Sequence, residues 1–131
     1  MAFIRASQGG GGELTETTIW TNSSPTSTFP DTTITLSDSI SNYKFLKIKF
    51  RKATTASDET SVMFDCDDFT EQIINTNKSV TCIAFVGTSV TYARRIGYVD
   101  DTHIHIDKNI QINGQATTTN YNIPVEIIGL K

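Results

Sequence analysis

Hydrophobic and polar residues alternate along several short stretches of the chain. The clearest is 43–52, where Leu46, Ile48 and Phe50 fall on one side of an extended backbone. Residues two apart share a face in a β-strand, so this pattern predicts a strand with one buried face. The opposite face carries Tyr43, Phe45, Lys47, Lys49 and Arg51. We expect a solvated sheet surface there, with a surface that stacks on sugars or meets an acidic partner as the alternative.

The same reasoning predicts strands along most of the chain. They cover 15–20, 33–37, 61–66, 79–87, 89–99, 102–106, 109–113 and 122–130. Pro25 and Pro30 break the segment 21–32, and Asn113-Gly114 is typical of a tight turn. Residues 67–78 are ambiguous between a short helical turn capped by Asp67 or Asp68 and an irregular strand. Eight or nine strands about ten residues apart predict an all-β protein, a β-sandwich with jelly-roll or Greek-key-like connections.

The composition agrees with this fold class and narrows the partners. The 131 residues suit one domain, and they include 21 Thr, 11 Ser and 16 Ile, whereas Leu and Ala are scarce. A net charge of −3 with 19% charged residues argues against nucleic acid as a partner, because phosphate binding needs a basic patch. There is no apolar run long enough for a membrane span, and no membrane association is expected.

The N-terminal segment 1–12 differs from the rest of the chain. It ends in four consecutive glycines, Gly9 to Gly12, which predict a flexible joint. We expect Ala2, Phe3, Ile4 and Arg5 to attach the domain of residues 13–131 to a larger assembly; a frayed terminus is the alternative. The segment lacks the apolar stretch of a signal peptide, which predicts synthesis in a cytoplasm. Cys66 and Cys82 are then expected to be buried thiols, with a disulfide as the alternative.

Two stretches resemble small bacteriophage virion proteins. The first is IWTNSSPTSTFPDTTITLS followed by YKFLKIKFR, and the second is RRIGYVDDTHIHID followed by NYNIPVEIIGLK. Together they cover most of 19–131 and are similar to tail, fibre-tip or head-fibre and decoration domains. The resemblance implies a virion component, made in the bacterial host cytoplasm, whose N-terminal peptide attaches it to other phage structural proteins. Fibre proteins usually carry a long shaft before such a domain, so a small accessory or decoration protein fits better than a whole fibre.

No catalytic motif accompanies this pattern. The chain has no Gly-x-Ser-x-Gly elbow, no His-Glu-x-x-His and no phosphate-binding glycine loop. Asp65, Asp67, Asp68 and Glu71 form an acidic group, but their spacing does not match a calcium-binding EF-hand loop. We therefore expect a protein that is not an enzyme and needs no cofactor.

His103 and His105, the two histidines of the chain, lie in the stretch THIHID. In a strand they would share a face with Asp107, while Ile104 and Ile106 would be buried. A His-x-His pair can chelate a metal with a third ligand from elsewhere, but we expect a solvated or interfacial strand face and no metal. His103 and His105 remain the weak alternative for a metal site.

Arg94 and Arg95 are adjacent, so they face opposite sides of a strand. Arg94 shares its face with Tyr92, Ile96 and Tyr98. If that face is the core, Arg94 needs a carboxylate partner or must reach the rim, and the alternative is a ligand or subunit contact.

The resemblance, with the absence of a catalytic motif, thus implies a non-enzymatic phage structural protein that mediates virion assembly or binds the host surface. A homotrimer is the expected assembly, and a host cell-surface glycan is a possible ligand. The alternatives are a carbohydrate-binding module and a capsid decoration protein without a ligand. The candidate ligand or subunit contacts are Trp20, Tyr43, Phe45, Tyr92, Arg94, Arg95 and Tyr98.

Overall fold

The computed structural model describes residues 14–70, 80–86, 90–112 and 116–131 of the chain, with the side chains of 80, 82–86 and 90 left out. Three predictions lie outside these residues. They are the attachment segment 1–12 with its glycine joint, the tight turn at Asn113-Gly114, and the burial of the Cys82 side chain.

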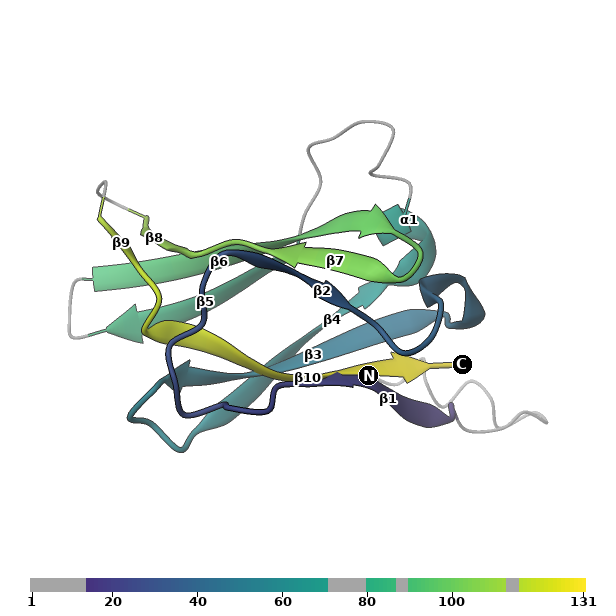
Figure 1. Ribbon diagram of the computed structural model, residues 1–131, viewed down its shortest axis with the longest axis horizontal. Helices are drawn as coiled ribbons and strands as arrows, with labels where there is room; N and C mark the ends of the chain where they lie inside the picture. The colour runs from purple at the N-terminus through teal and green to yellow at the C-terminus, as the bar shows by residue number, and fades with distance from the viewer. Residues whose placement is uncertain (1–13, 71–79, 87–89, 113–115) are drawn as a thin grey trace.

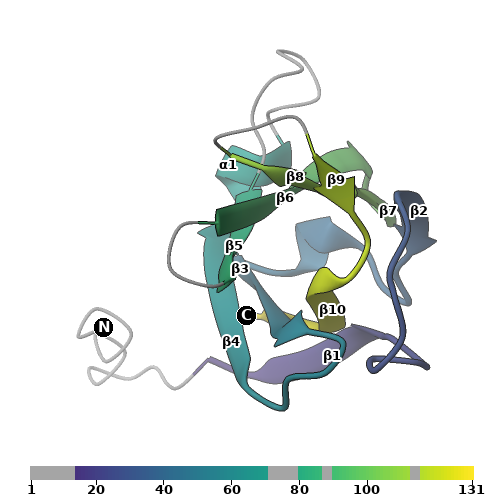
Figure 2. The same cartoon turned by 90° about the vertical axis from the view of Figure 1, so that its left-hand side faces the viewer.

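The described chain forms two antiparallel sheets that lie one above the other (Figures 1 and 2). The four-stranded sheet has the order β1 (Glu16–Thr21), β10 (Tyr121–Leu130), β3 (Phe45–Ala53) and β4 (Glu59–Asp65). The six-stranded sheet runs through β2 (Thr32–Thr35), β7 (His103–Ile106), β6 (Val90–Asp100), β8 (Asn109–Gln111) and β9 (Thr117–Thr118), and β5 (Val80–Val86) pairs with β6. The predicted all-β sandwich is confirmed.

The core lies between the sheets and is built from the predicted alternation. Leu46, Ile48 and Phe50 of β3 point into it, and Ile104 and Ile106 of β7 do so from the other sheet. Each fully buried aliphatic side chain of this size contributes about 1.5–3 kcal/mol to folding relative to an exposed one. The remaining core is Ile19, Phe29, Ile34, Leu36, Ile40, Tyr43, Cys66, Phe69, Ile96, Ile123 and Ile127.

The structure corrects the sequence-based elements at several points. A helix α1 (Cys66–Thr70) is present, but its cap is Asp65, whose Oδ1 accepts the backbone N–H groups of Asp67 and Asp68. The prediction that Asp67 or Asp68 is the cap is therefore wrong. The two-residue strand β9 and a 3-10 turn, η2 (Ile40–Asn42), were not predicted. Both are too short to leave a recognisable hydrophobic period. Within the described residues, no helix is long and apolar enough to cross a membrane.

The strand predicted from residue 43 begins at Phe45, and Tyr43 lies before it. The Tyr43 ring is buried, and its hydroxyl donates a hydrogen bond of 2.7 Å to Asp38 Oδ2. Tyr43 therefore does not extend the basic face of β3, and that part of the prediction is wrong. Burial, together with the Asp38 carboxylate, raises the pKa of this phenol.

Both ends of the described chain meet at one end of the sandwich (Figure 1). Thr15 and Lys131 exchange backbone hydrogen bonds of 2.7 and 3.1 Å. Strand β10 has ten residues, so its start lies about 30 Å from this point at roughly 3.3 Å per residue. The loops 22–31, 54–58 and 119–120 gather around that start, with Phe29 bonded to Thr119 and Thr54 to Asn120. We call these three loops the distal end.

Candidate functional site

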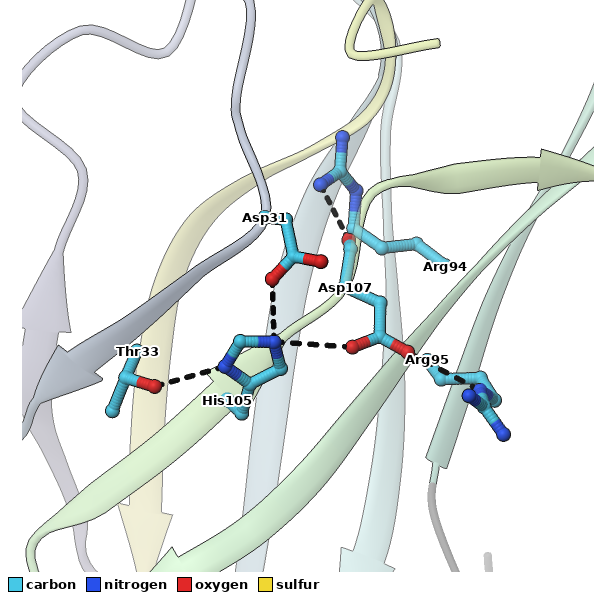
Figure 3. A network of polar contacts seen from close by, with 6 residues as sticks. All are labelled: Asp31, Thr33, Arg94, Arg95, His105 and Asp107. Carbon is cyan, nitrogen blue, oxygen red and sulfur yellow. Dashed lines mark hydrogen bonds and ion pairs between the residues drawn. The ribbon is translucent and has the colours of Figure 1, made fainter. Parts of the chain in front are cut away.

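A compact polar network lies beside the distal end, on the outer face of the six-stranded sheet (Figure 3). Strands β2 and β7 pair so that Thr33 lies opposite His105 and Thr32 opposite Ile106. The next positions along this register are Asp31, just before β2, and Asp107, just after β7. Residues two apart share a face, so Asp31 and Thr33 meet His105 and Asp107 across the pair. The fold thus joins a loop residue near position 30 to a strand more than 70 residues later.

His105 lies at the centre of this network. Its Nε2 is 2.6 Å from Asp31 Oδ1 and 3.2 Å from Asp107 Oδ1, and its Nδ1 is 2.8 Å from the Thr33 hydroxyl. The three side chains are partly exposed, with 36% of His105, 48% of Asp31 and 26% of Asp107 accessible to solvent. The ligand atoms of Asp31, His105 and Asp107 all lie within 4.8 Å of one another, which is close enough to hold one metal ion.

Arg95 and Asp107 extend the network on the exposed side of β6. The Arg95 Nε donates to Asp107 Oδ2 at 3.2 Å, and the Asp107 backbone N–H donates to the Arg95 carbonyl at 2.9 Å. The Arg95 side chain is 65% exposed, so it remains available for contact with a partner. The ion pair fixes one oxygen of Asp107 and leaves the other directed at His105 (Figure 3).

Arg94 points the opposite way, into the interior, as two adjacent strand residues must. It is fully buried, and its guanidinium donates to the carbonyl oxygens of Asp107 at 2.6 Å, Phe29 at 3.1 Å and Tyr121 at 3.0 Å. It also lies 5.4 Å from the centre of the Phe29 ring. The Arg94 guanidinium therefore links the loop 22–31, the end of β7 and the start of β10. This corrects the expectation of a ligand or subunit contact, because Arg94 offers no surface.

Two buried asparagines continue this polar interior. Asn122 donates to Asn109 Oδ1 at 2.7 Å and to the Tyr92 carbonyl at 3.2 Å, and Asn109 in turn donates to the Tyr121 carbonyl. Asn122 has a positive φ of 52°, which a side chain tolerates only at a cost. No signal in the sequence separates these two asparagines from those of ordinary turns.

The aromatic residues predicted as contacts do not form one surface. Trp20 packs edge-on against Phe29 at 6.1 Å, and it is only partly buried. Tyr92 stacks on Tyr121 at 5.0 Å. The first pair joins β1 to the loop before β2 and the second joins β6 to the start of β10, so the rings belong to separate contacts.

Tyr98 and Phe45 occupy further separate positions. Tyr98 packs edge-on against the buried Phe69 at 5.7 Å, and burial raises the pKa of its phenol, helped by the nearby Asp101 and Asp100 carboxylates. Phe45 is partly buried at the start of β3. Phe45 and Trp20 face different neighbours on the four-stranded sheet, because β10 separates their strands.

Trp20 lines an open pocket of about 450 Å³ between the edge strands of the two sheets. Strand β1 ends one sheet and β2 ends the other, and the Ser37 backbone N–H donates to the Ile19 carbonyl at 2.8 Å across the two edges. The lining residues are Thr18, Ile19, Trp20, Thr21, Thr35, Leu36 and Ser37. An aromatic ring among hydroxyl groups is chemistry that suits a sugar.

His103 belongs to a different network from His105. Its Nδ1 lies 2.7 Å from Asp100 Oδ1, and the Thr102 backbone N–H donates to the same oxygen. These bonds hold the pKa of Asp100 below its usual value, the Thr102 bond first and the His103 bond second. His103 and His105 share the outer face of β7, as predicted, with Ile104 and Ile106 buried behind them. Among the described residues, however, the group that could hold a metal pairs His105 with Asp31 and Asp107 and leaves His103 out.

Two lysines of the basic face of β3 pair with acidic residues of other strands in the same sheet. Lys49 Nζ lies 3.1 Å from Glu126 of β10, and Lys47 lies 3.9 Å from Glu16 of β1. The bond to Glu126 raises the pKa of Lys49. Paired charges of this kind are typical of a solvated sheet face. They explain why basic residues recur at every second position of β3.

Cys66, at the start of α1, is a free and buried thiol. Burial, reinforced by the Asp65 and Asp67 carboxylates, raises its pKa to about 12. A thiol held protonated in this way is a poor nucleophile and a poor metal ligand. The prediction of a buried thiol is confirmed for Cys66.

The sequence matches no protein-family model and no curated protein. The fold and the geometry of the sites therefore define the class of protein on their own: a two-sheet β-sandwich with polar networks on the outer face of one sheet and in its interior.

Proposed function

We propose that the chain is a non-enzymatic structural protein of a bacteriophage virion. It is attached through residues 1–12 and presents the distal end of its sandwich to the host surface or to a neighbouring subunit. The proposal rests on the resemblance of 19–131 to small virion domains and on the polarity of the fold. The observation that supports the proposal most directly is that both ends of the described chain lie at one end of the sandwich, opposite the distal loops.

The polarity follows from the backbone bonds between Thr15 and Lys131, which bring both ends of the described chain to one end of the sandwich. Any segment that precedes residue 14 joins the domain there. The distal end lies about 30 Å away along β10, at roughly 3.3 Å per residue. A tether at one end leaves the loops 22–31, 54–58 and 119–120 free to meet a partner.

The distal end also has the rigidity that a recognition surface needs. Arg94 bonds to the carbonyl groups of Phe29, Asp107 and Tyr121, so three separate segments are fixed to one buried cation. Loops held in this way lose little conformational entropy when they bind a partner. The distal loops therefore suit recognition, with the exposed Asp31 in one of them and the exposed Arg95 on the neighbouring strand β6 as polar contacts.

The attachment is tested with particles grown in host cells that supply the chain in trans to a phage lacking its own copy. The host cells express the full chain, residues 13–131 alone, or the full chain with Phe3→Ser and Ile4→Ser. The control carries Ser7→Ala with Gln8→Ala, which alters the same segment without removing its apolar residues. Quantitative immunoblots of purified particles give the copies bound.

We expect the full chain and the control on the particles, and at least a tenfold loss for the truncated chain and the apolar variant. The truncated chain must first show an unchanged thermal transition, so that loss of binding is not loss of folding. Equal incorporation of all four chains would overturn attachment through the N-terminal segment.

We further propose a homotrimer, because closed cyclic symmetry is usual for oligomers and threefold symmetry for fibre-associated domains. Light scattering on a sizing column at micromolar concentration measures the mass. A value near three times the 14.4 kDa of the chain is expected. A monomeric mass across the concentration range would refute the trimer. It would favour a decoration protein whose copy number is set by the particle to which it binds.

A carbohydrate-binding module is the second candidate, and the pocket beside Trp20 favours it. Thr35 lines that pocket from β2 and is exposed, so Thr35→Lys should fill it without disturbing the core. Thr28→Lys adds the same charge to an exposed loop position outside the pocket. On an array of bacterial surface glycans, a hit that Thr35→Lys weakens tenfold and Thr28→Lys leaves intact would support the module. A uniformly negative array would remove it.

A further inference from the structure

We infer that Asp31, His105 and Asp107 form a binding site for a divalent transition-metal ion of the zinc class, which fastens the loop before β2 to the end of β7. This inference goes beyond the proposed function and does not depend on it. It rests on the positions of three ligand atoms and on the bonds that orient them.

The separations between the ligand atoms fit a shared ion. Zinc takes imidazole nitrogen and carboxylate oxygen ligands at about 2.0–2.2 Å, which in a tetrahedral site places neighbouring ligand atoms roughly 3.4 Å apart. His105 Nε2 lies 2.6 Å from Asp31 Oδ1 and 3.2 Å from Asp107 Oδ1. Small adjustments of these partly exposed side chains are therefore enough to admit an ion among the three atoms.

A second layer of bonds holds two of the three ligands, His105 and Asp107, in place. The Thr33 hydroxyl lies 2.8 Å from His105 Nδ1, so the ring nitrogen that does not face the carboxylates is also engaged. Arg95 holds Asp107 Oδ2 at 3.2 Å and leaves Oδ1 for the ion. Metal-binding histidines and carboxylates are oriented by such outer bonds in many proteins. Three surface side chains that lie close together by chance would not need such orienting bonds.

The charges around the site favour a divalent cation. Two carboxylates flank a ring nitrogen, and the Arg95 guanidinium balances one of them. Arg94 approaches Asp107 only at its backbone carbonyl, inside the sheet. One imidazole and two carboxylates are ligands of zinc and of manganese, whereas calcium wants six to eight oxygens and magnesium keeps mostly water.

His103 provides a matched control. It lies two residues before His105 on the same face of the same strand, and it pairs with a single carboxylate, Asp100. The inference predicts that His105→Gln weakens binding at least tenfold and that His103→Gln leaves it unchanged. Asp31→Asn is the second test variant, because it keeps the size of an exposed loop residue and removes only the charge.

Isothermal titration of zinc chloride into the untagged full chain at pH 7.5 measures the binding. We expect one equivalent per chain for the wild type and His103→Gln, and at least tenfold weaker binding for His105→Gln and Asp31→Asn. Thermal unfolding with zinc at a hundred times the wild-type dissociation constant should raise the transition by about 10 °C in the first two proteins and by no more than about half as much in the other two.

Cobalt in place of zinc identifies the ligands. The site contains oxygen and nitrogen donors, so the cobalt spectrum should lack the intense near-ultraviolet band of a thiolate. Absence of zinc binding by the wild type would overturn the inference and leave His105 as an ion-pair partner of the two aspartates. Equal binding by His105→Gln, or a thiolate band, would also overturn it, because the metal would then lie elsewhere.

Discussion

Replacing Arg94 by methionine should destabilise the fold more than any change at the exposed surface. Methionine keeps the length of the side chain but cannot donate, so the carbonyl groups of Phe29, Asp107 and Tyr121 lose a charged partner. Each hydrogen bond to a charged group contributes about 1.5–3 kcal/mol. The relief from burying a guanidinium offsets part of this sum.

We therefore expect the free energy of unfolding to fall by about 3–5 kcal/mol, the range found when one partner of a buried charged network is removed. The thermal midpoint should fall by about 10–20 °C for a domain of this length. Urea unfolding followed by tryptophan fluorescence suits the question, because Trp20 packs against Phe29, whose carbonyl Arg94 holds.

Arg95→Met is the matched control, since it makes the same substitution one position along β6. Its side chain is 65% exposed and makes a surface ion pair, so the expected loss is at most about 1 kcal/mol. A loss under 1 kcal/mol for Arg94→Met, equal to that of Arg95→Met, would refute the idea that a buried cation fastens the distal end.

Three further predictions concern other parts of the fold. Gly129→Ala should cost about 1–3 kcal/mol because a Cβ there would lie about 2.5 Å from the Tyr43 ring, whereas Gly97→Ala meets nothing within 4 Å and should cost far less; urea unfolding compares them. Burial and the Asp38 carboxylate raise the pKa of Tyr43 above 10.0, so the stability it contributes is complete below pH 10.0 and is lost as pH rises through the folded pKa; Tyr43→Phe should flatten that alkaline loss in pH-dependent unfolding. Cys66, with a pKa of about 12, should stay unmodified by iodoacetamide at pH 8 in the folded protein and react after unfolding, as peptide mass mapping would show; labelling of the folded protein would contradict its burial.

The strands and the core were readable from the sequence because each residue's burial depends on a period of two. Ile104 and Ile106 are buried and His103 and His105 are not, as the alternation in THIHID predicts. The same reasoning placed Leu46, Ile48 and Phe50 in the core. It failed at Tyr43, which lies before the strand and turns its ring inward, because the period says nothing of where a strand begins.

The polar sites could not be read from the sequence, because they depend on how strands pair. Asp31 gave no local signal, and only the pairing of β2 with β7 brings it to His105. Arg94 was expected to need a carboxylate or the rim, yet it donates to backbone carbonyls from three segments. Every residue has a backbone carbonyl, so the sequence cannot indicate which carbonyls accept a hydrogen bond from Arg94. Only the folded structure shows them.

The account turns on whether the chain is part of a virion, and quantitative mass spectrometry of purified particles tests this most directly. The proposed function requires a phage that encodes the chain. Particles of that phage are banded to constant density, washed in high salt and digested, and peptides of the chain are counted against those of the major capsid protein. We predict peptides from 13–131 at a fixed ratio to capsid, in a multiple of three copies per particle. Their absence from the washed particles, with the chain present only in the infected-cell lysate, would contradict the account.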